Sequence, residues 1–191
     1  MRRLAGLATD PQTLFLGARE VIRSVQGRGS GADVAASVYG GLVLYRADPL
    51  EVEPIPASPP LTAVYSGSKL PTPEVIRIVE DRRVRDPDRF EFLFDLMDRC
   101  SGEAAAAARA ARWDEVGALL DIGQGLMEAM ELSNPALDAI IQALRADAGI
   151  RGAKISGSGL GDCAIGLGRT GPAFAFPVMA VTPAEQGLVF A

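Results

Sequence analysis

Two glycine-rich segments hold the residues whose types and spacing could bind an anion. The first is Gly27-Arg28-Gly29-Ser30-Gly31-Ala32-Asp33, and a helical pattern follows it directly. Glycine lets the backbone approach a ligand closely, and the free N–H groups at a helix start favour an anion. Asp33 falls in the first turn of that helix, where the dipole stabilises a carboxylate. The segment therefore predicts either an anion-binding loop or a flexible turn capped by Asp33.

The second segment is Lys154-Ile155-Ser156-Gly157-Ser158-Gly159-Leu160-Gly161-Asp162-Cys163. Its small polar residues and glycines, flanked by a lysine and by two predicted strands, suit a loop that wraps around a phosphate or a sugar. The other interpretation is a tight turn between strands, although such a turn needs fewer glycines.

Two common nucleotide-binding motifs are excluded. Gly166-Leu167-Gly168-Arg169-Thr170-Gly171 satisfies GxGxxG, but Pro172 follows it and no helical pattern does, so the context of a dinucleotide-binding fold is missing. No GxxxxGK[ST] segment occurs, which excludes an ordinary P-loop.

The composition narrows the chemistry further. The 191 residues contain no histidine, which excludes Ser-His-Asp and Cys-His catalysis and histidine-ligated zinc. Proton transfer must then fall to Asp, Glu, Lys, Cys or Tyr. A net charge of −5 argues against a general nucleic-acid binder, which needs a basic surface.

The chain is expected to be a reduced cytoplasmic protein. Cys100 and Cys163 are its two cysteines, too few for a disulfide framework and not spaced as a CxxC metal or redox site. Asp10 and Pro11 arrive before a signal-peptide apolar region could develop. No stretch of the sequence approaches the apolar length of a membrane span, so a membrane is not expected as a partner. Nucleic acid is not expected as a partner either, because the net charge is negative.

Apolar periodicity predicts a mixed α+β fold. We expect helices over 14–25, 32–39, 73–83, 90–100, 102–112, 113–131 and 135–148, and strands over 42–45, 62–66, 150–155, 163–167 and 176–181. Thr72 is the expected N-cap of the third helix, with Pro73 at its first position. Residues 82–89 are predicted to form a turn, and the prolines of residues 54–60 an extended linker. This order favours an antiparallel sheet with helices on one face.

The glycine segments together resemble the GHMP kinase family, in its mevalonate and phosphomevalonate kinase branch. The run Gly29-Ser30-Gly31-Ala32-Asp33-Val34-Ala35-Ala36-Ser37-Val38-Tyr39-Gly40-Gly41 is similar to the family's GSGxDxAxxxxGG segment, and residues 152–163 are similar to its C-terminal glycine motif. The Gly161-Asp162-Cys163 ending looks more like phosphomevalonate kinases, since mevalonate kinases usually have Gly in place of Asp162. Residues 65–72 resemble the substrate-side loop, and residues 132–138 the start of a family helix. The resemblance runs from about Leu14 to Val189.

The resemblance implies a phosphotransferase that uses ATP and Mg²⁺ to phosphorylate a small alcohol or phosphate acceptor, mevalonate or phosphomevalonate. It implies Asp33 as the catalytic carboxylate. Phosphoryl transfer needs mostly positioning and charge neutralisation, so one carboxylate, backbone N–H groups and a metal can suffice without histidine. The resemblance also implies a phosphate and active-site loop of Ser156, Gly157, Ser158, Gly159 and Gly161, and substrate-side residues Ser30, Ser37 and Lys69. No protein metal ligand is assigned.

The family's opening strand and its ATP-phosphate loop have no counterpart before Leu14. By resemblance, residues 1–45 are a helical remnant of the family's N-terminal domain, and residues 46–191 are its ferredoxin-like C-terminal domain. The helices of residues 14–39 are then expected to expose apolar surface. We expect the isolated chain to be inactive, and to be either half of a split kinase completed by a separately encoded N-terminal half, or a non-catalytic relic or binding module that self-associates as an oligomer. A misplaced start codon is a third alternative.

Overall fold

The computed structural model describes residues 10–26 and 29–188. These divide into two compact units, one of residues 10–26, 29–58 and 183–188 and one of residues 59–182. Each unit has its own apolar core. Compactness defines these units, so the assignment of residues 1–45 and 46–191 to two family domains stays a prediction. In the described part of the chain, none of the helices combines the length and the apolar character that crossing a membrane requires.

The N-terminal unit packs two helices against a β-hairpin. Helices α1 (Pro11–Gln26) and α2 (Ala32–Tyr39) are followed by the antiparallel strands β1 (Leu42–Ala47) and β2 (Leu50–Ile55). The buried ring of Phe15 lies between those of Tyr39 and Tyr45, with centroids 6.3 and 6.2 Å away. The expected apolar exposure is present on α1, where Val21 and Val25 are 61% and 78% exposed.

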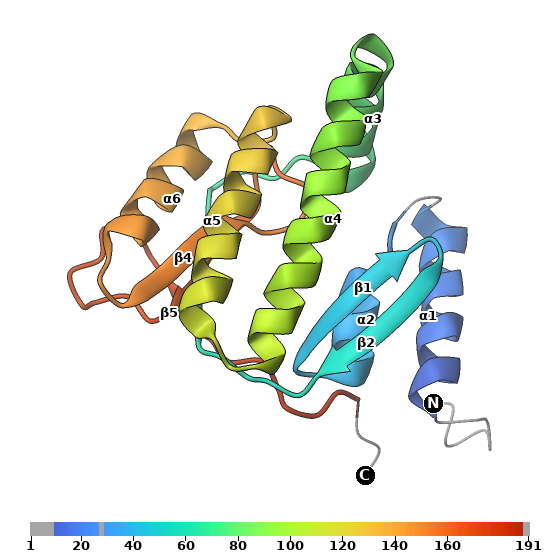
Figure 1. Cartoon of the computed structure of the whole chain (residues 1–191), viewed down its shortest axis with the longest axis horizontal. Coiled ribbons are helices and arrows are strands. Elements are labelled where there is room, and N and C mark those ends of the chain that lie inside the picture. Colours follow the sequence, from blue (N-terminus) through green and yellow to red (C-terminus); the bar gives the residue numbers. More distant parts are fainter. Residues whose placement is uncertain (1–9, 27–28, 189–191) are drawn as a thin grey trace. The chain divides into compact units, whose positions relative to one another are not determined.

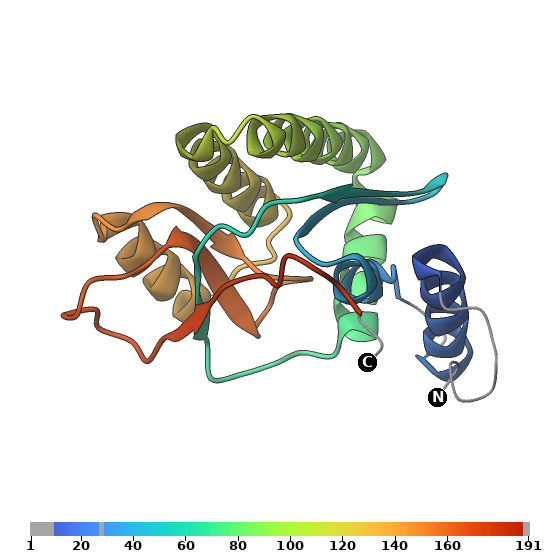
Figure 2. The ribbon, with the colours of Figure 1, turned by 90° about the horizontal axis from the view of Figure 1, so that it is seen from below.

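The C-terminal unit contains a four-stranded antiparallel sheet in the order β4-β5-β3-β6. Its strands are β3 (Leu61–Tyr65), β4 (Ile150–Ile155), β5 (Cys163–Gly168) and β6 (Met179–Val181). Its helices are α3 (Thr72–Arg85), α4 (Pro87–Arg109), α5 (Trp113–Ala129) and α6 (Pro135–Ala146). Helices α4 and α5 lie side by side as a helical hairpin (Figures 1 and 2).

Helix α6 supplies much of the apolar core of this unit. Leu137, Ile140, Ile141 and Leu144 recur at helical spacing and are almost fully buried. They join a cluster that includes Ile155 of β4. The expected α+β class, with an antiparallel sheet and packed helices, is therefore confirmed, and in the N-terminal unit strand β2 pairs with the strand expected at 42–45.

Helix α5 closes the outer edge of β4 with polar side chains. The Ala153 N–H donates to Asp121 Oδ1 at 2.9 Å, and the Ile155 N–H donates to Gln124 Oε1 at 2.8 Å. The approach is close because Gly117 of α5 faces Gly152 of β4: a Cβ on Gly117 would lie 2.3 Å from the Arg151 carbonyl oxygen. The last residues of β4, which lead into the second glycine segment, are thereby fixed to a helix.

Replacing Gln124 with leucine should destabilise the C-terminal unit by about 2 kcal/mol, because it leaves the buried N–H of Ile155 without an acceptor. Urea unfolding followed by the fluorescence of Trp113 measures this, since Trp113 is the one tryptophan of the chain. The matched control is Gln142→Leu at an exposed position of α6, which should change stability by less than about 0.5 kcal/mol. Equal effects of the two substitutions would contradict the role of Gln124.

Three local predictions were wrong. The residues of the expected linker begin within strand β2, where Pro54 pairs with Val43 in a two-stranded hairpin whose outer edge does not need its N–H. The expected turn at 82–89 is reduced to Asp86, which ends α3 and accepts a hydrogen bond from the Arg89 N–H at the start of α4. Helix α4 then continues through Ser101 and Gly102. Pro71, not Thr72, is the N-cap of α3.

Candidate phosphate-binding site

The loop of residues 156–162 connects β4 to β5 and requires glycine at two positions. Gly159 has φ +88°, and a Cβ there would lie 2.4 Å from the Leu132 carbonyl oxygen. Gly161 has φ +140°, and a Cβ there would lie 2.8 Å from the Ser68 carbonyl oxygen. Both residues are therefore held where side chains would be strained and would collide with backbone. The loop is built around close backbone contacts, which a simple strand-to-strand turn does not need.

Several backbone donors of this loop remain open. The Ser156 N–H donates to the Cys163 carbonyl at 2.8 Å, and the Leu160 N–H donates to the Leu132 carbonyl at 2.7 Å. By contrast, the N–H groups of Gly157, Ser158 and Gly159 donate to no other residue that the structure describes. Successive free N–H groups in a left-handed turn form a concavity suited to an anion.

Lys69 is held at the far end of this loop. Its Nζ lies 2.7 Å from Asp162 Oδ2, with the two side chains 60% and 41% exposed. The backbones are also joined: the Asp162 N–H donates to the Ser68 carbonyl, and the Ser66 N–H donates to the Asp162 carbonyl. The structure thus places Lys69 beside the end of the 156–162 loop.

Asp162 is a residue that the sequence analysis did not include in the site. It adopts φ +68°, a conformation that Asp tolerates better than most residues other than glycine. Its carboxylate raises the pKa of the Lys69 ammonium above the ordinary value of 10.5 through a hydrogen bond and charge attraction. The one sequence signal that could have suggested this pairing with Lys69 is the position of Asp162 directly after Gly161, at the end of a segment with three glycines.

We predict that Asp162→Asn lowers the Lys69 pKa towards 10.5, because the ion pair that favours the charged amine is lost. A pKa raised in the folded state stabilises the fold at pH values below the unfolded pKa, and that contribution disappears as pH rises through the folded pKa. The stabilisation that the charged Lys69 provides is therefore present at neutral pH and is lost in strongly alkaline solution. A ¹³C NMR titration of labelled lysine measures the pKa, and an unchanged value in the variant would contradict the assignment.

The two cysteines are free thiols and half-buried. Burial raises the pKa of Cys100, whose Sγ donates to the Leu119 carbonyl. Burial also raises the pKa of Cys163, and the neighbouring Asp162 carboxylate raises it further. Neither thiol is therefore an activated nucleophile at neutral pH.

Asp33 lies in the first turn of α2, in the N-terminal unit. It is exposed, and its carboxylate has no partner among the described residues. Ser37 lies four residues later on the same helix face, but its hydroxyl donates to the Asp33 carbonyl at 2.9 Å. Gly31, with φ +88°, precedes the helix. Two residues of the segment, Gly27 and Arg28, lie outside the described residues.

Ser30 has a structural role in the N-terminal unit. Its Oγ accepts from the Ala32 N–H at 3.3 Å, which helps to begin α2. Its carbonyl accepts from the Tyr45 hydroxyl and from Arg19 Nε. Ser30 and Ser37 thus use their polar groups within their own unit, whereas the Asp33 carboxylate is available for chemistry.

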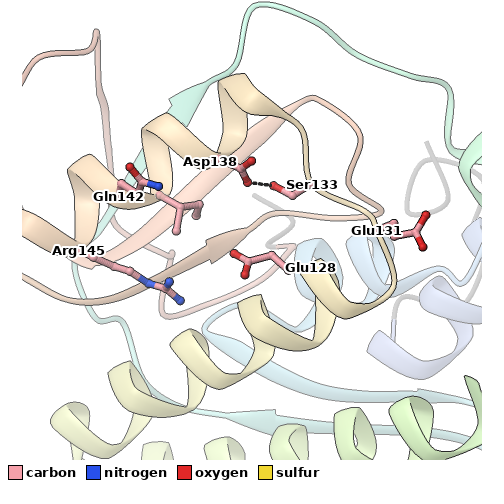
Figure 3. Close-up of a pocket in the computed structure, with 7 residues that line it drawn as sticks. Glu128, Glu131, Ser133, Asp138, Gln142 and Arg145 are labelled. Atoms are coloured by element: carbon pink, nitrogen blue, oxygen red, sulfur yellow. Dashed lines mark hydrogen bonds between the residues drawn. The ribbon is translucent and has the colours of Figure 1, made fainter. Parts of the chain in front are cut away.

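A polar pocket of about 510 Å³ lies between the end of α5 and α6 (Figure 3). Its charged side chains already have partners: Glu128 accepts from Gln124, Glu131 pairs with Arg82, and Ser133 donates to Asp138 at 2.5 Å. Arg145 likewise pairs with Asp121. These contacts join helices, so this pocket is a weaker candidate than the glycine loop.

A second pocket of about 390 Å³ adjoins the glycine loop and is mostly apolar. Gly157 and Ser158 form part of its wall, and helices α3, α4 and α5 supply residues such as Val79, Met97 and Met127. Gly157 and Ser158, whose N–H groups are open, therefore also border an apolar space under helices.

The described residues contain no group of three Asp, Glu, Cys or His side chains close enough to hold a metal ion. Mg²⁺ commonly binds through substrate phosphates and only one or two carboxylates. An ion held mainly by substrate phosphates needs no all-protein cage, and the described residues do not provide one.

Comparison with known proteins identifies relatives for this arrangement. The family model described as GHMP kinases C terminal matches residues 104–175. Mevalonate kinase of Archaeoglobus fulgidus is 34% identical over 158 residues, which are 83% of this chain and 52% of that protein. Mevalonate kinase of Thermococcus sibiricus is 30% identical over 170 residues, 86% of this chain and 50% of that protein. The chain thus spans about half the length of the curated relatives it matches.

A solved structure agrees with these sequence relatives. The crystal structure of L. major mevalonate kinase in complex with R-mevalonate superposes with a TM-score of 0.79 and 25% identity, covering 95% of this chain and 60% of that one. The fold, the matched C-terminal model and the sequence similarity lead to one conclusion: residues 104–175 are a GHMP kinase C-terminal domain.

Proposed function

We propose that this chain takes part in the ATP-dependent phosphorylation of a small hydroxy acid, mevalonate or phosphomevalonate, as one half of a split kinase. The carrying observation is the 156–162 loop, which has open N–H groups at residues 157–159 and whose last residue, Asp162, pairs with Lys69. The similarity to mevalonate kinases, one of them crystallised with R-mevalonate, supports the choice of acceptor. The proposed setting is the cytoplasm and the mevalonate pathway of isoprenoid biosynthesis.

In this proposal the residues divide the work of phosphoryl transfer. Asp33 accepts the proton of the acceptor hydroxyl as that oxygen bonds to the γ-phosphorus and the bond to the ADP oxygen breaks. The N–H groups of Gly157, Ser158 and Gly159 neutralise the charge of the transferring phosphoryl group. Lys69 binds an anionic group of the acceptor. Mg²⁺, when bound, screens the phosphate charges.

The partner in this proposal is an N-terminal kinase half that contributes the ATP-phosphate loop. The exposed apolar residues of α1, among them Val21 and Val25, are consistent with a surface that a partner or a second copy covers. An oligomer of the chain alone is the competing arrangement, and analytical ultracentrifugation with and without the added half separates the two.

The experiment that tests the proposal is isothermal titration of Mg·ATP into the chain alone and into the chain mixed with the N-terminal half of the Archaeoglobus fulgidus relative. We expect binding, and turnover of R-mevalonate, only in the mixture. Phosphomevalonate is offered in parallel to identify the acceptor. Absence of binding in both samples would overturn the catalytic proposal.

A further inference from the structure

Lysine is rare in this chain and is found only beside the glycine loop. Of the 19 basic residues, 17 are arginine and two are lysine, Lys69 and Lys154. Lys69 pairs with the residue that ends the loop, and Lys154 lies two residues before its start. A lysine ammonium is a compact point charge, whereas arginine presents a wide planar fork. A chain that otherwise uses arginine therefore has compact cations at these two positions.

Lys154 is held in an unusual way. Its side chain is half-buried, and its Nζ donates to the carbonyl of Ile155, the last residue of β4, at 2.5 Å. The side chain lies against α5, since a Cβ on Gly123 would be 3.8 Å from Lys154 Cε. Within the residues that the structure describes, Lys154 forms no ion pair with a carboxylate.

The surrounding helices place this cation below the loop. Gly123 and Met127 lie one turn apart on α5, and Cys100 and Met97 lie one turn apart on α4, where Cys100 interacts electrostatically with Lys154. Met97 and Met127 line the apolar pocket whose wall includes Gly157 and Ser158. The Lys154 side chain thus lies against α5, and α4 and α5 are the helices that supply Met97 and Met127 to this pocket.

A structural role alone does not account for a charge at this position. Burial lowers the pKa of Lys154, so the fold works against its charged form. An unpaired cation in apolar surroundings is costly unless an anion compensates it. The open N–H groups of Gly157, Ser158 and Gly159 follow Lys154 closely in the chain and could bind such an anion.

We propose that Lys154 is a positioning residue for the anion of the glycine loop, fixing the Ile155 carbonyl at the loop's base and supplying positive charge beneath it. The inference rests on the proposed function, in which this loop binds a phosphate group. Because the surroundings are poor in water, this charge is screened less than an exposed one and strengthens anion binding at the loop.

Inorganic pyrophosphate titrated into the full chain tests this, with ¹³Cε-labelled lysine as the probe. Two lysines give two signals, which Lys69→Arg and Lys154→Arg assign. We expect the Lys154 signal of the wild-type chain to shift as pyrophosphate binds. Lys154→Met keeps the length of the side chain and removes its charge, and it should weaken pyrophosphate binding about tenfold.

The matched control is Arg151→Met, which removes a positive charge from the same strand. Arg151 is exposed and pairs with Asp114, so pyrophosphate affinity should change less than twofold. Thermal melting establishes that each variant is folded, and the wild-type shift needs no variant at all. A Lys154 signal that stays fixed while pyrophosphate binds, or a Lys154→Met affinity equal to that of wild type, would overturn the inference and leave the proposed function intact. A wild-type chain that binds no pyrophosphate would overturn the inference as well, whereas the proposed function is tested separately by Mg·ATP titration in the presence of the N-terminal half.

Discussion

Asp33→Asn should lower kcat of the kinase reconstituted with an N-terminal half about a thousandfold, with little change in KM for ATP. The reason is that asparagine cannot accept the proton of the acceptor hydroxyl, and general-base catalysis contributes about 10²–10⁴ to rate. Initial rates of ADP formation from R-mevalonate measure the effect. Since the carboxylate is exposed and unpartnered among the described residues, the variant should fold normally.

The control for this prediction is Glu20→Gln, which removes an exposed carboxylate from α1 of the same unit and should leave the rate within twofold. Should the Asp33→Asn enzyme turn over at the rate of the control, Asp33 would not be the base, and only a role in helix initiation would remain for it.

The largest effect on stability is expected at Gly117. Gly117→Ala should destabilise the C-terminal unit by about 3 kcal/mol, because the new Cβ would lie 2.3 Å from the Arg151 carbonyl oxygen and would push α5 away from β4. That shift would also weaken the hydrogen bonds from Ala153 and Ile155 to Asp121 and Gln124. Urea unfolding, again followed by Trp113, measures the difference.

Helix α5 offers its own control. Gly125 is exposed and a Cβ there meets nothing within 4 Å, so Gly125→Ala should stabilise the unit by up to about 1 kcal/mol through helix propensity. Opposite signs for two glycine-to-alanine changes in one helix would be difficult to explain without the close approach. If Gly117→Ala were also stabilising, the contact between α5 and β4 would not be as tight as described.

Long amphipathic helices were the most predictable part of this fold. Helix α6 repeats apolar residues at helical spacing, and Asn134 followed by Pro135 marks its start, so its position could be deduced from local pattern. Strand β2 could not, because its charges and Pro54, the first of several closely spaced prolines, resemble a linker and only the pairing with β1 makes it a strand. Asp86 followed by Pro87 carries the same signal for a helix start, but the local pattern does not show that α3 continues up to Asp86.

The site shows the same limit. The glycines of residues 156–162 were predictable because glycine spacing is a local signal. The pairing of Lys69 with Asp162 joins residues 93 positions apart, and the burial of Lys154 depends on how α4 and α5 pack. Such contacts depend on the tertiary structure, so they cannot be predicted from a local sequence pattern.

The polar side chains that α5 extends to β4 have a consequence beyond stability. An uncovered edge strand offers a row of N–H and C=O groups to which another polypeptide can add, and this is a common route to aggregation. Asp121 and Gln124 occupy the outward N–H groups of Ala153 and Ile155. At these positions, growth of the sheet into a second molecule is blocked, and a chain with two glycine-rich loops and an apolar helix surface is protected from self-association through this edge.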